Sequence, residues 1–133
     1  MARLLDEHPP GRVITLRRGE QRAIEDRTGW ERRILSPALP GVEFEFIRTA
    51  VPTGVTVGSF APHAPGSREY VAVESGALTV TLDGRDVLLG EGDALYYAGD
   101  CVHAFANHGE RACVYYTAMD VGTSAHQMIP EQT

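Results

Sequence analysis

The sequence predicts an all-β protein, a sandwich or barrel built around one hydrophobic core. Three observations favour this class. Short runs that alternate apolar and polar residues follow one another, glycine and proline separate them at regular intervals, and no long stretch has the period of an amphipathic helix. A chain of 133 residues with 43 % hydrophobic residues suits one such domain.

The N-terminal part of the chain combines helical and extended signals. Residues 2–7 and Gln21–Arg27 have the composition of short helices, whereas Val13–Arg17 alternates like a strand. Two prolines and a glycine end the first eleven residues, which favours a linker over residues 1–11. We therefore expect the barrel domain to cover residues 12–133.

Two arginine doublets and an alternating segment mark the next strands. Glu31–Leu35 is expected to form a strand. The doublets Arg17-Arg18 and Arg32-Arg33 both fall within alternating patterns, so a solvated strand face is their expected environment. Val42–Phe46 alternates cleanly, with its three apolar side chains on one face.

The remaining strands are separated by turns with glycine signals. Asp83-Gly84 predicts a two-residue hairpin, because glycine tolerates a positive φ angle. A second turn is expected at residues 90–93. Around these turns the expected strands are Val55–Val57, Leu78–Leu82, Val87–Leu89, Ala94–Tyr97 and Ala112–Ala118.

Charge and composition weigh against several function classes. A net charge of −6 argues against nucleic-acid binding by this segment, because phosphate contacts require clustered lysine and arginine. No apolar run reaches the ~18–20 residues that cross a membrane, and the N-terminus lacks the apolar part of a secretory signal. Cys101 and Cys113 form no disulfide framework, so we expect reduced thiols in a cytoplasmic protein.

Glu69 departs from the pattern of its strand. It alternates with Val71 and Val73, so the carboxylate points into the barrel if the two valines do. A buried carboxylate is costly unless a cation or hydrogen-bond donors satisfy it. Two interpretations remain open for Glu69: a functional group in the interior, or a residue at the barrel rim paired with an arginine.

Two histidines accompany this carboxylate. His103 shares a strand face with Phe105 and Asn107, where it is either a ligand nitrogen or a core histidine bonded to a backbone carbonyl. His63 lies between Pro62 and Pro65 in a rigid extended segment. Two imidazoles and a carboxylate are the donor types of a three-ligand site for Fe, Mn, Ni or Zn.

The spacing of these residues resembles the cupin superfamily. Glu69 and Gly76 match one half of the first cupin motif, and Gly92, His103 and Asn107 match the second. The resemblance implies a double-stranded β-helix, or jelly-roll barrel, in which both motifs meet at one mouth. Pro65 stands where metal-binding cupins carry a second histidine, so at most three ligands remain. Any divalent metal is therefore expected to be weakly bound or absent.

Other segments are similar to the C-terminal cupin domain of bacterial helix-turn-helix regulators. The similar segments are Arg17-Arg18-Gly19-Glu20, Leu35-Ser36-Pro37 and Pro65–Val71. This resemblance implies a small-molecule-sensing and dimerising domain, preceded in such regulators by a DNA-binding domain that this chain lacks. Residues 1–11 would then include the end of that domain. A small metal-dependent cupin enzyme (dioxygenase, isomerase or lyase) and a purely dimerising unit remain alternatives.

A homodimer is expected, with Val13–Arg17 and Val42–Ile47 extending a sheet across a two-fold axis. We expect no robust catalysis, a small-molecule effector, and metal binding at most through His63, Glu69 and His103. The residues predicted to contact the ligand are Phe60, His63, Glu69, Val71, Tyr97, His103 and Phe105.

Overall fold

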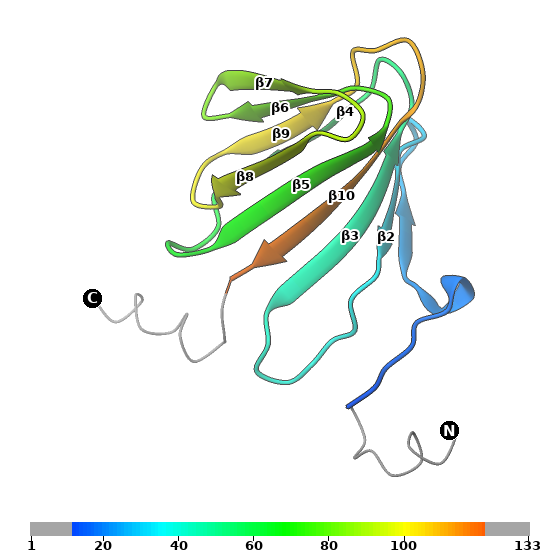
Figure 1. The fold of residues 1–133 in the computed structure, drawn as a ribbon, viewed down its shortest axis with the longest axis vertical. Coiled ribbons are helices and arrows are strands. Elements are labelled where there is room, and N and C mark those ends of the chain that lie inside the picture. The colour runs from blue at the N-terminus through cyan, green and yellow to red at the C-terminus, as the bar shows by residue number, and fades with distance from the viewer. Residues whose placement is uncertain (1–11, 122–133) are drawn as a thin grey trace.

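The computed structural model describes residues 12–121, which form two antiparallel β-sheets with a core between them (Figure 1). A short 3₁₀ helix, η1 (Arg18–Glu20), precedes the strands. The strands are β1 (Ala23–Glu25), β2 (Glu31–Ile34), β3 (Phe44–Val51), β4 (Thr56–Phe60), β5 (Arg68–Ser75), β6 (Leu78–Leu82), β7 (Arg85–Leu89), β8 (Ala94–Ala98), β9 (His103–Ala106) and β10 (Cys113–Asp120).

The two sheets differ in size. The larger has the strand order β1-β2-β3-β10-β5-β8, and the smaller has the order β4-β9-β6-β7. Figure 1 shows the long strands β3, β10 and β5 side by side. No helix within residues 12–121 is long and apolar enough to cross a membrane. The prediction of a nearly all-β jelly-roll barrel is confirmed.

Alternation along the strands builds the core. On β5, Glu69, Val71 and Val73 are buried while the residues between them are exposed. Strand β10 alternates in the same way, and β3 does so from Ile47 onward. The largest fully buried apolar side chains are Tyr115, Leu78, Val51, Val57, Val71 and Val80, and they come from both sheets. The predicted inward orientation of Glu69 is thus confirmed.

Two residues of the sequence motifs have structural roles away from the cavity. Gly76 has a φ angle of +81°, and a Cβ atom there would lie 2.5 Å from the carbonyl oxygen of Ala112. The Asn107 side chain is fully buried, and its Nδ2 donates to the carbonyl oxygens of Val51 and Arg111, both at 2.9 Å. Its Oδ1 accepts from the backbone N–H of Gly109. Both residues fix the chain at the end of the barrel.

Most of the central strands are where the sequence predicts them. The hairpin at Asp83-Gly84 is confirmed, and both residues have positive φ angles, 48° and 82°. The turn at residues 90–93 is confirmed by the backbone bond from Asp93 N–H to Gly90 O, at 3.0 Å. In Val42–Phe46 the strand begins only at Phe44, and the three apolar side chains share an outer, exposed face.

The N-terminal predictions are corrected by the structure. Val13–Arg17 forms no strand, and Gln21–Arg27 forms no helix but contains β1. The reason is a non-local pairing: β1 lies against β2, and the Asp26 N–H bonds to the Trp30 carbonyl across their turn. Such pairing overrides weak helix propensity. The predicted linker and helix within residues 1–11 lie outside the described residues.

The expected route of dimerisation is also corrected. Strand β3, which contains most of Val42–Ile47, is paired with β2 on one side and with β10 on the other. It therefore has no free edge along which a second chain could add. The edges of the larger sheet are β1 and β8.

Candidate metal and ligand site

The strand register places Glu69 in a row of inward side chains across the larger sheet. Glu69 of β5 lies opposite Tyr97 of β8 and opposite Met119 of β10. Met119 in turn lies opposite Glu45 of β3. Glu69 is only 6 % exposed, and its Oε1 atom has no hydrogen-bond partner. A buried carboxylate oxygen without a donor is costly, so this atom calls for a cation or a ligand.

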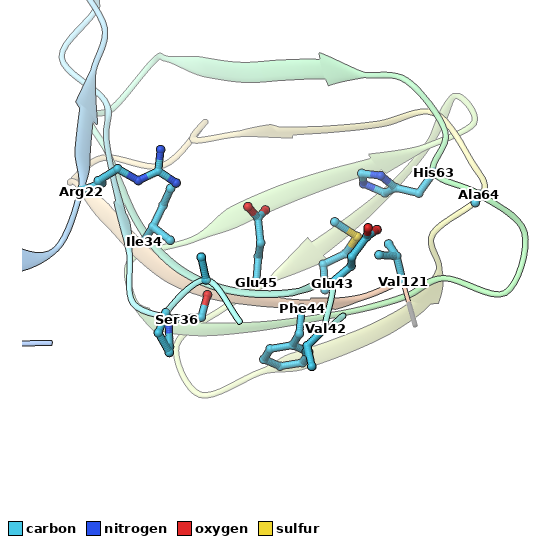
Figure 2. Close-up of a pocket in the computed structure, with 13 residues that line it drawn as sticks. Arg22, Ile34, Ser36, Val42, Glu43, Phe44, Glu45, His63, Ala64 and Val121 are labelled. Carbon is cyan, nitrogen blue, oxygen red and sulfur yellow. The ribbon is translucent and has the colours of Figure 1, made fainter. Parts of the chain in front are cut away.

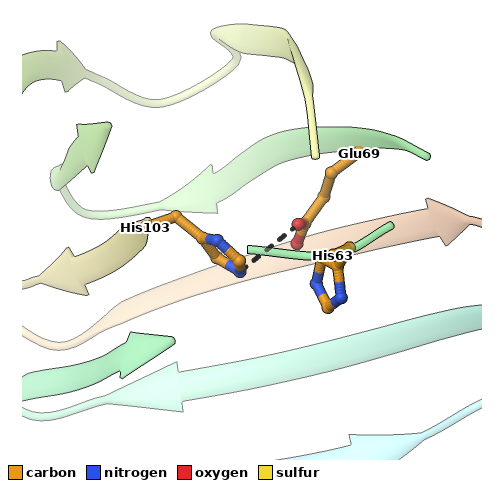
Figure 3. Close-up of side chains that lie close together, drawn as sticks. All are labelled: His63, Glu69 and His103. Atoms are coloured by element: carbon orange, nitrogen blue, oxygen red, sulfur yellow. Dashed lines mark ion pairs between the residues drawn. The ribbon is translucent and has the colours of Figure 1, made fainter. Parts of the chain in front are cut away.

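The two histidines approach Glu69 from other parts of the chain (Figure 3). His103, on β9, lies opposite Phe60 of β4, and their rings stack with centroids 5.4 Å apart. His63 follows β4, and its backbone N–H donates to Gly99 O at 2.9 Å, which holds the segment against the end of β8. The His63 and His103 rings lie 5.1 Å apart.

The hydrogen bond of His103 determines which nitrogen faces Glu69. Its Nδ1 lies 2.9 Å from the carbonyl oxygen of Cys101, and a carbonyl can only accept, so Nδ1 carries a proton. In the neutral ring Nε2 is then a lone-pair donor, and it lies 3.7 Å from Glu69 Oε1. Two lone pairs that face each other in a buried site require a cation or a proton between them.

The three side chains fit a divalent transition metal in donor type, and one pair of them also has the spacing of donors that share an ion. One donor atom from each of His63, Glu69 and His103 lies within 4.8 Å of the others. Donors that share an ion at about 2.1 Å lie at most about 4.2 Å apart, so the ring nitrogen of His103 and Glu69 Oε1 already meet this limit. Among residues 12–121 this is the cluster of three such donors that could hold an ion.

A small cavity surrounds these donors, and a larger pocket adjoins it. The inner cavity has a volume of about 90 Å³, and the outer pocket about 540 Å³. Glu45, His63 and Met119 line both. Figure 2 shows Arg22, Glu45 and His63 around the outer pocket, whose wall is otherwise mostly apolar. The arrangement can hold a small polar head near the donors and a bulkier body outside.

Five of the seven residues predicted to contact a ligand line the inner cavity: Phe60, His63, Glu69, His103 and Phe105. Val71 and Tyr97 do not, since Val71 lies in the core and Tyr97 lies beside the cavity with its ring 5.9 Å from that of His103. Burial, together with the nearby Glu69 carboxylate, raises the pKa of Tyr97 well above its usual range. Tyr97 therefore stays a neutral phenol beside Glu69.

Sequence reasoning missed several residues of the cavity wall. Arg32, Glu45, Thr49, Tyr115, Thr117 and Met119 all line it. Placing the Arg32-Arg33 doublet on a solvated face is wrong, because the Arg33 side chain is only 15 % exposed and Arg32 lines the cavity. Arg33 bonds to Glu31 at 3.2 Å on the opposite strand face, whereas Arg32 points inward. Alternation with Ile34 was the available signal, because Arg32 and Ile34 share a face.

Comparison with known proteins agrees with this geometry. The model of a family described as a cupin domain matches residues 48–120. No curated protein matches the chain. The solved cupin domain of an XRE family transcriptional regulator from Enterobacter cloacae is 25 % identical with a TM-score of 0.63, covering 68 % of this chain and 95 % of that one.

Two further solved structures share the fold at lower identity. An HTH_3 family transcriptional regulator from Vibrio cholerae is 21 % identical with a TM-score of 0.61, over 68 % of this chain and 50 % of that one. This chain thus spans about half of that regulator. A predicted oxalate decarboxylase from Thermotoga maritima is 19 % identical with a TM-score of 0.60, over 80 % of this chain and 98 % of that one.

Proposed function

The chain belongs to the cupin family, and we propose that it is the small-molecule-sensing and dimerising domain of a cytoplasmic transcriptional regulator. The observation that carries this proposal is the buried Glu69 oxygen, which has no hydrogen-bond partner and faces two imidazoles inside a cavity. The likeness to the regulator domain from Enterobacter cloacae supports it. The net charge of −6 means that DNA contacts belong to another part of such a regulator.

His63, Glu69 and His103 would hold one divalent metal in this cavity. Such an ion supplies a Lewis-acidic coordination position for an oxygen or nitrogen atom of the effector. Phe60 and Phe105 line the same cavity and keep water away from these donors. The carbonyl oxygen of Cys101 orients the His103 ring so that Nε2 faces inward.

Three protein ligands without a fourth make weak, exchangeable metal binding the expectation. Pro65, in place of a second histidine, removes a possible nitrogen donor from the segment that holds His63. Such a site suits a sensor in which the effector completes the coordination. A metal-dependent enzyme is the second candidate, because three protein ligands with an open position also serve catalysis.

A thermal-shift screen tests the sensing proposal. Wild-type protein and Glu69→Gln are each heated with small organic acids, amines and neutral compounds, with and without Zn(II). At a free concentration of about 100 times its Kd, an effector raises the free energy of unfolding of the wild type by about 2.7 kcal/mol. We expect at least one chemical class to raise the melting temperature of the wild type and to lose most of this effect in Glu69→Gln. Equal shifts in both proteins, or no shift in either, would contradict the proposal.

The proposed dimer uses the outer face of the larger sheet. Four aromatic rings stand on this face in two pairs, Phe46 with Tyr116 and Tyr70 with Tyr96, at centroid separations of 5.9 and 5.2 Å. Together with neighbouring alanines they line an apolar hollow of about 420 Å³. Exposed apolar patches of this kind mark interaction sites on soluble proteins.

A charge on this face is expected to separate the dimer. In sedimentation at micromolar concentration we expect wild-type protein to be dimeric and Tyr96→Arg to be monomeric. Leu88→Arg is the matched control, because Leu88 is 76 % exposed on β7 of the smaller sheet. A monomeric wild type, or a Tyr96→Arg variant that remains dimeric, would refute this interface.

A further inference from the structure

The cavity contains a cation that the proposed metal site does not use. Arg32 of β2 lies opposite Thr49 of β3, and Thr49 lies opposite Tyr115 of β10, so all three share one inward row. All three line the inner cavity together with Glu69 and His103. The guanidinium carbon of Arg32 lies 5.2 Å from the centre of the Phe60 ring and 5.6 Å from that of Trp30. Two aromatic rings therefore hold the guanidinium in place.

This guanidinium lacks an anionic partner within the described residues. The Nε atoms of Arg32 and Arg33 are both buried without a hydrogen-bond partner, but none of the ion pairs within residues 12–121 includes Arg32. Arg33 contrasts with it on the same strand. Arg33 pairs with Glu31 and donates to the carbonyl oxygen of Arg18. A partly buried arginine with free donors is a ready site for a carboxylate, which it can bind through two parallel hydrogen bonds.

The charge of the cavity depends on the metal. Its wall carries one cation, Arg32, and two carboxylates, Glu45 and Glu69, besides the two imidazoles. The charges of Arg32, Glu45 and Glu69 sum to −1, and a divalent ion would make this sum positive. An anion is thus favoured only after the metal has bound, and the anion in turn favours the metal.

The size of the two chambers indicates the shape of that anion. A volume of about 90 Å³ admits a group of a few heavy atoms such as a carboxylate. The adjoining pocket of about 540 Å³ has apolar walls at Ile34, Pro37, Val42 and Phe44, and it is also lined by the charged residues Arg22, Glu43 and Glu45. A longer apolar body would lie there.

We propose that Arg32 binds the carboxylate head of an organic anion whose apolar body lies in the outer pocket, and that this anion and the metal strengthen each other's binding. This inference rests on the proposed sensing function and assigns it a class of effector. Arg32 would bind the carboxylate, and a metal held by His63, Glu69 and His103 would add a second attraction for it in the same cavity.

Zinc titrations with a series of fatty acids test this coupling. Trp30, the only tryptophan of the chain, lies against Arg32 and supplies a fluorescence signal. Zn(II) is titrated into wild-type protein alone and in the presence of acetate, butyrate or octanoate. We expect octanoate to raise the affinity for Zn(II) about tenfold, a typical coupling between two sites, and acetate to raise it less. Octanoate without metal is expected to leave the fluorescence unchanged.

Two arginine variants identify the anion-binding group. Arg32→Gln is expected to keep the affinity for Zn(II) alone within about tenfold, since only a longer-range charge is lost, and to lose the effect of octanoate. Arg33→Gln is the matched control, and we expect it to keep both the affinity for Zn(II) and the effect of octanoate on that affinity. Arg32→Lys retains the charge without the planar donor pair, and we expect it to keep only part of the effect.

An unchanged affinity for Zn(II) in the presence of octanoate, or coupling that persists in Arg32→Gln, would overturn the role of Arg32 while leaving the sensing function open. A screen in which no compound distinguishes wild type from Glu69→Gln would instead overturn the sensing function itself.

Discussion

Gly76→Ala is expected to lower the free energy of unfolding by about 3 kcal/mol or more, because a positive φ angle and a steric clash add at this position. Gly76 has a φ angle of +81°, where an alanine is strained. Its Cβ would also lie 2.5 Å from Ala112 O and 2.8 Å from Cys113 Cα, both backbone atoms that cannot rotate away. Denaturant unfolding followed by circular dichroism measures the change.

Gly84→Ala separates these two causes. Gly84 has nearly the same φ angle, +82°, in the hairpin between β6 and β7, but no atom lies within 4 Å of the position that its Cβ would take. We expect Gly84→Ala to lower the free energy of unfolding by about 1 kcal/mol, because only the backbone strain of the positive φ angle remains. If Gly76→Ala and Gly84→Ala lower the free energy of unfolding equally, the close approach between Gly76 and β10 is not a determinant of stability.

Glu69→Gln is expected to lower the affinity for Zn(II) or Co(II) by about 100-fold or more, because loss of a ligand costs at least as much as loss of a group that orients one. Glutamine keeps the size of the side chain but removes the charge that faces His63 and His103. The visible absorption of bound Co(II) reports the binding directly. His103→Ala is expected to have an effect of the same order.

Glu45→Gln is the matched control for this prediction. Glu45 lines the same cavity but does not belong to the group of donors formed by His63, Glu69 and His103. We expect its affinity for Co(II) to remain within about tenfold of the wild type, since only a longer-range charge is lost. An equal loss in Glu45→Gln and Glu69→Gln would mean that the metal lies elsewhere in the cavity.

Local alternation predicts much of this site from sequence. The pattern of Glu69, Val71 and Val73 places the carboxylate inside, and His103 with Phe105 follows the same rule on β9. These residues lie on strands with strong local signals. That Glu69 and His103 lie close together could be predicted only from the resemblance of the two segments to cupin motifs, because period-two alternation specifies a face and not a partner strand.

The rest depends on pairings between distant segments. Val13–Arg17 alternates but forms no strand, whereas Ala23–Glu25 becomes one because β2 offers it an edge. Arg32 has the charge of a surface residue, and only the packing of β2 against β3 turns it toward the cavity. Glu45 and Met119 likewise reach the site through the register between β3 and β10.

The fate of a bound molecule tests the sensing role most directly. Wild-type protein and Glu69→Gln are dialysed to equilibrium against the compound that stabilises the wild type most, and the recovered compound is analysed by mass spectrometry. We expect the wild type to retain the compound chemically unchanged, and Glu69→Gln to bind it at least about tenfold more weakly, a difference of about 1.4 kcal/mol. Conversion to a new product that stops in Glu69→Gln would contradict the sensing role and establish an enzyme.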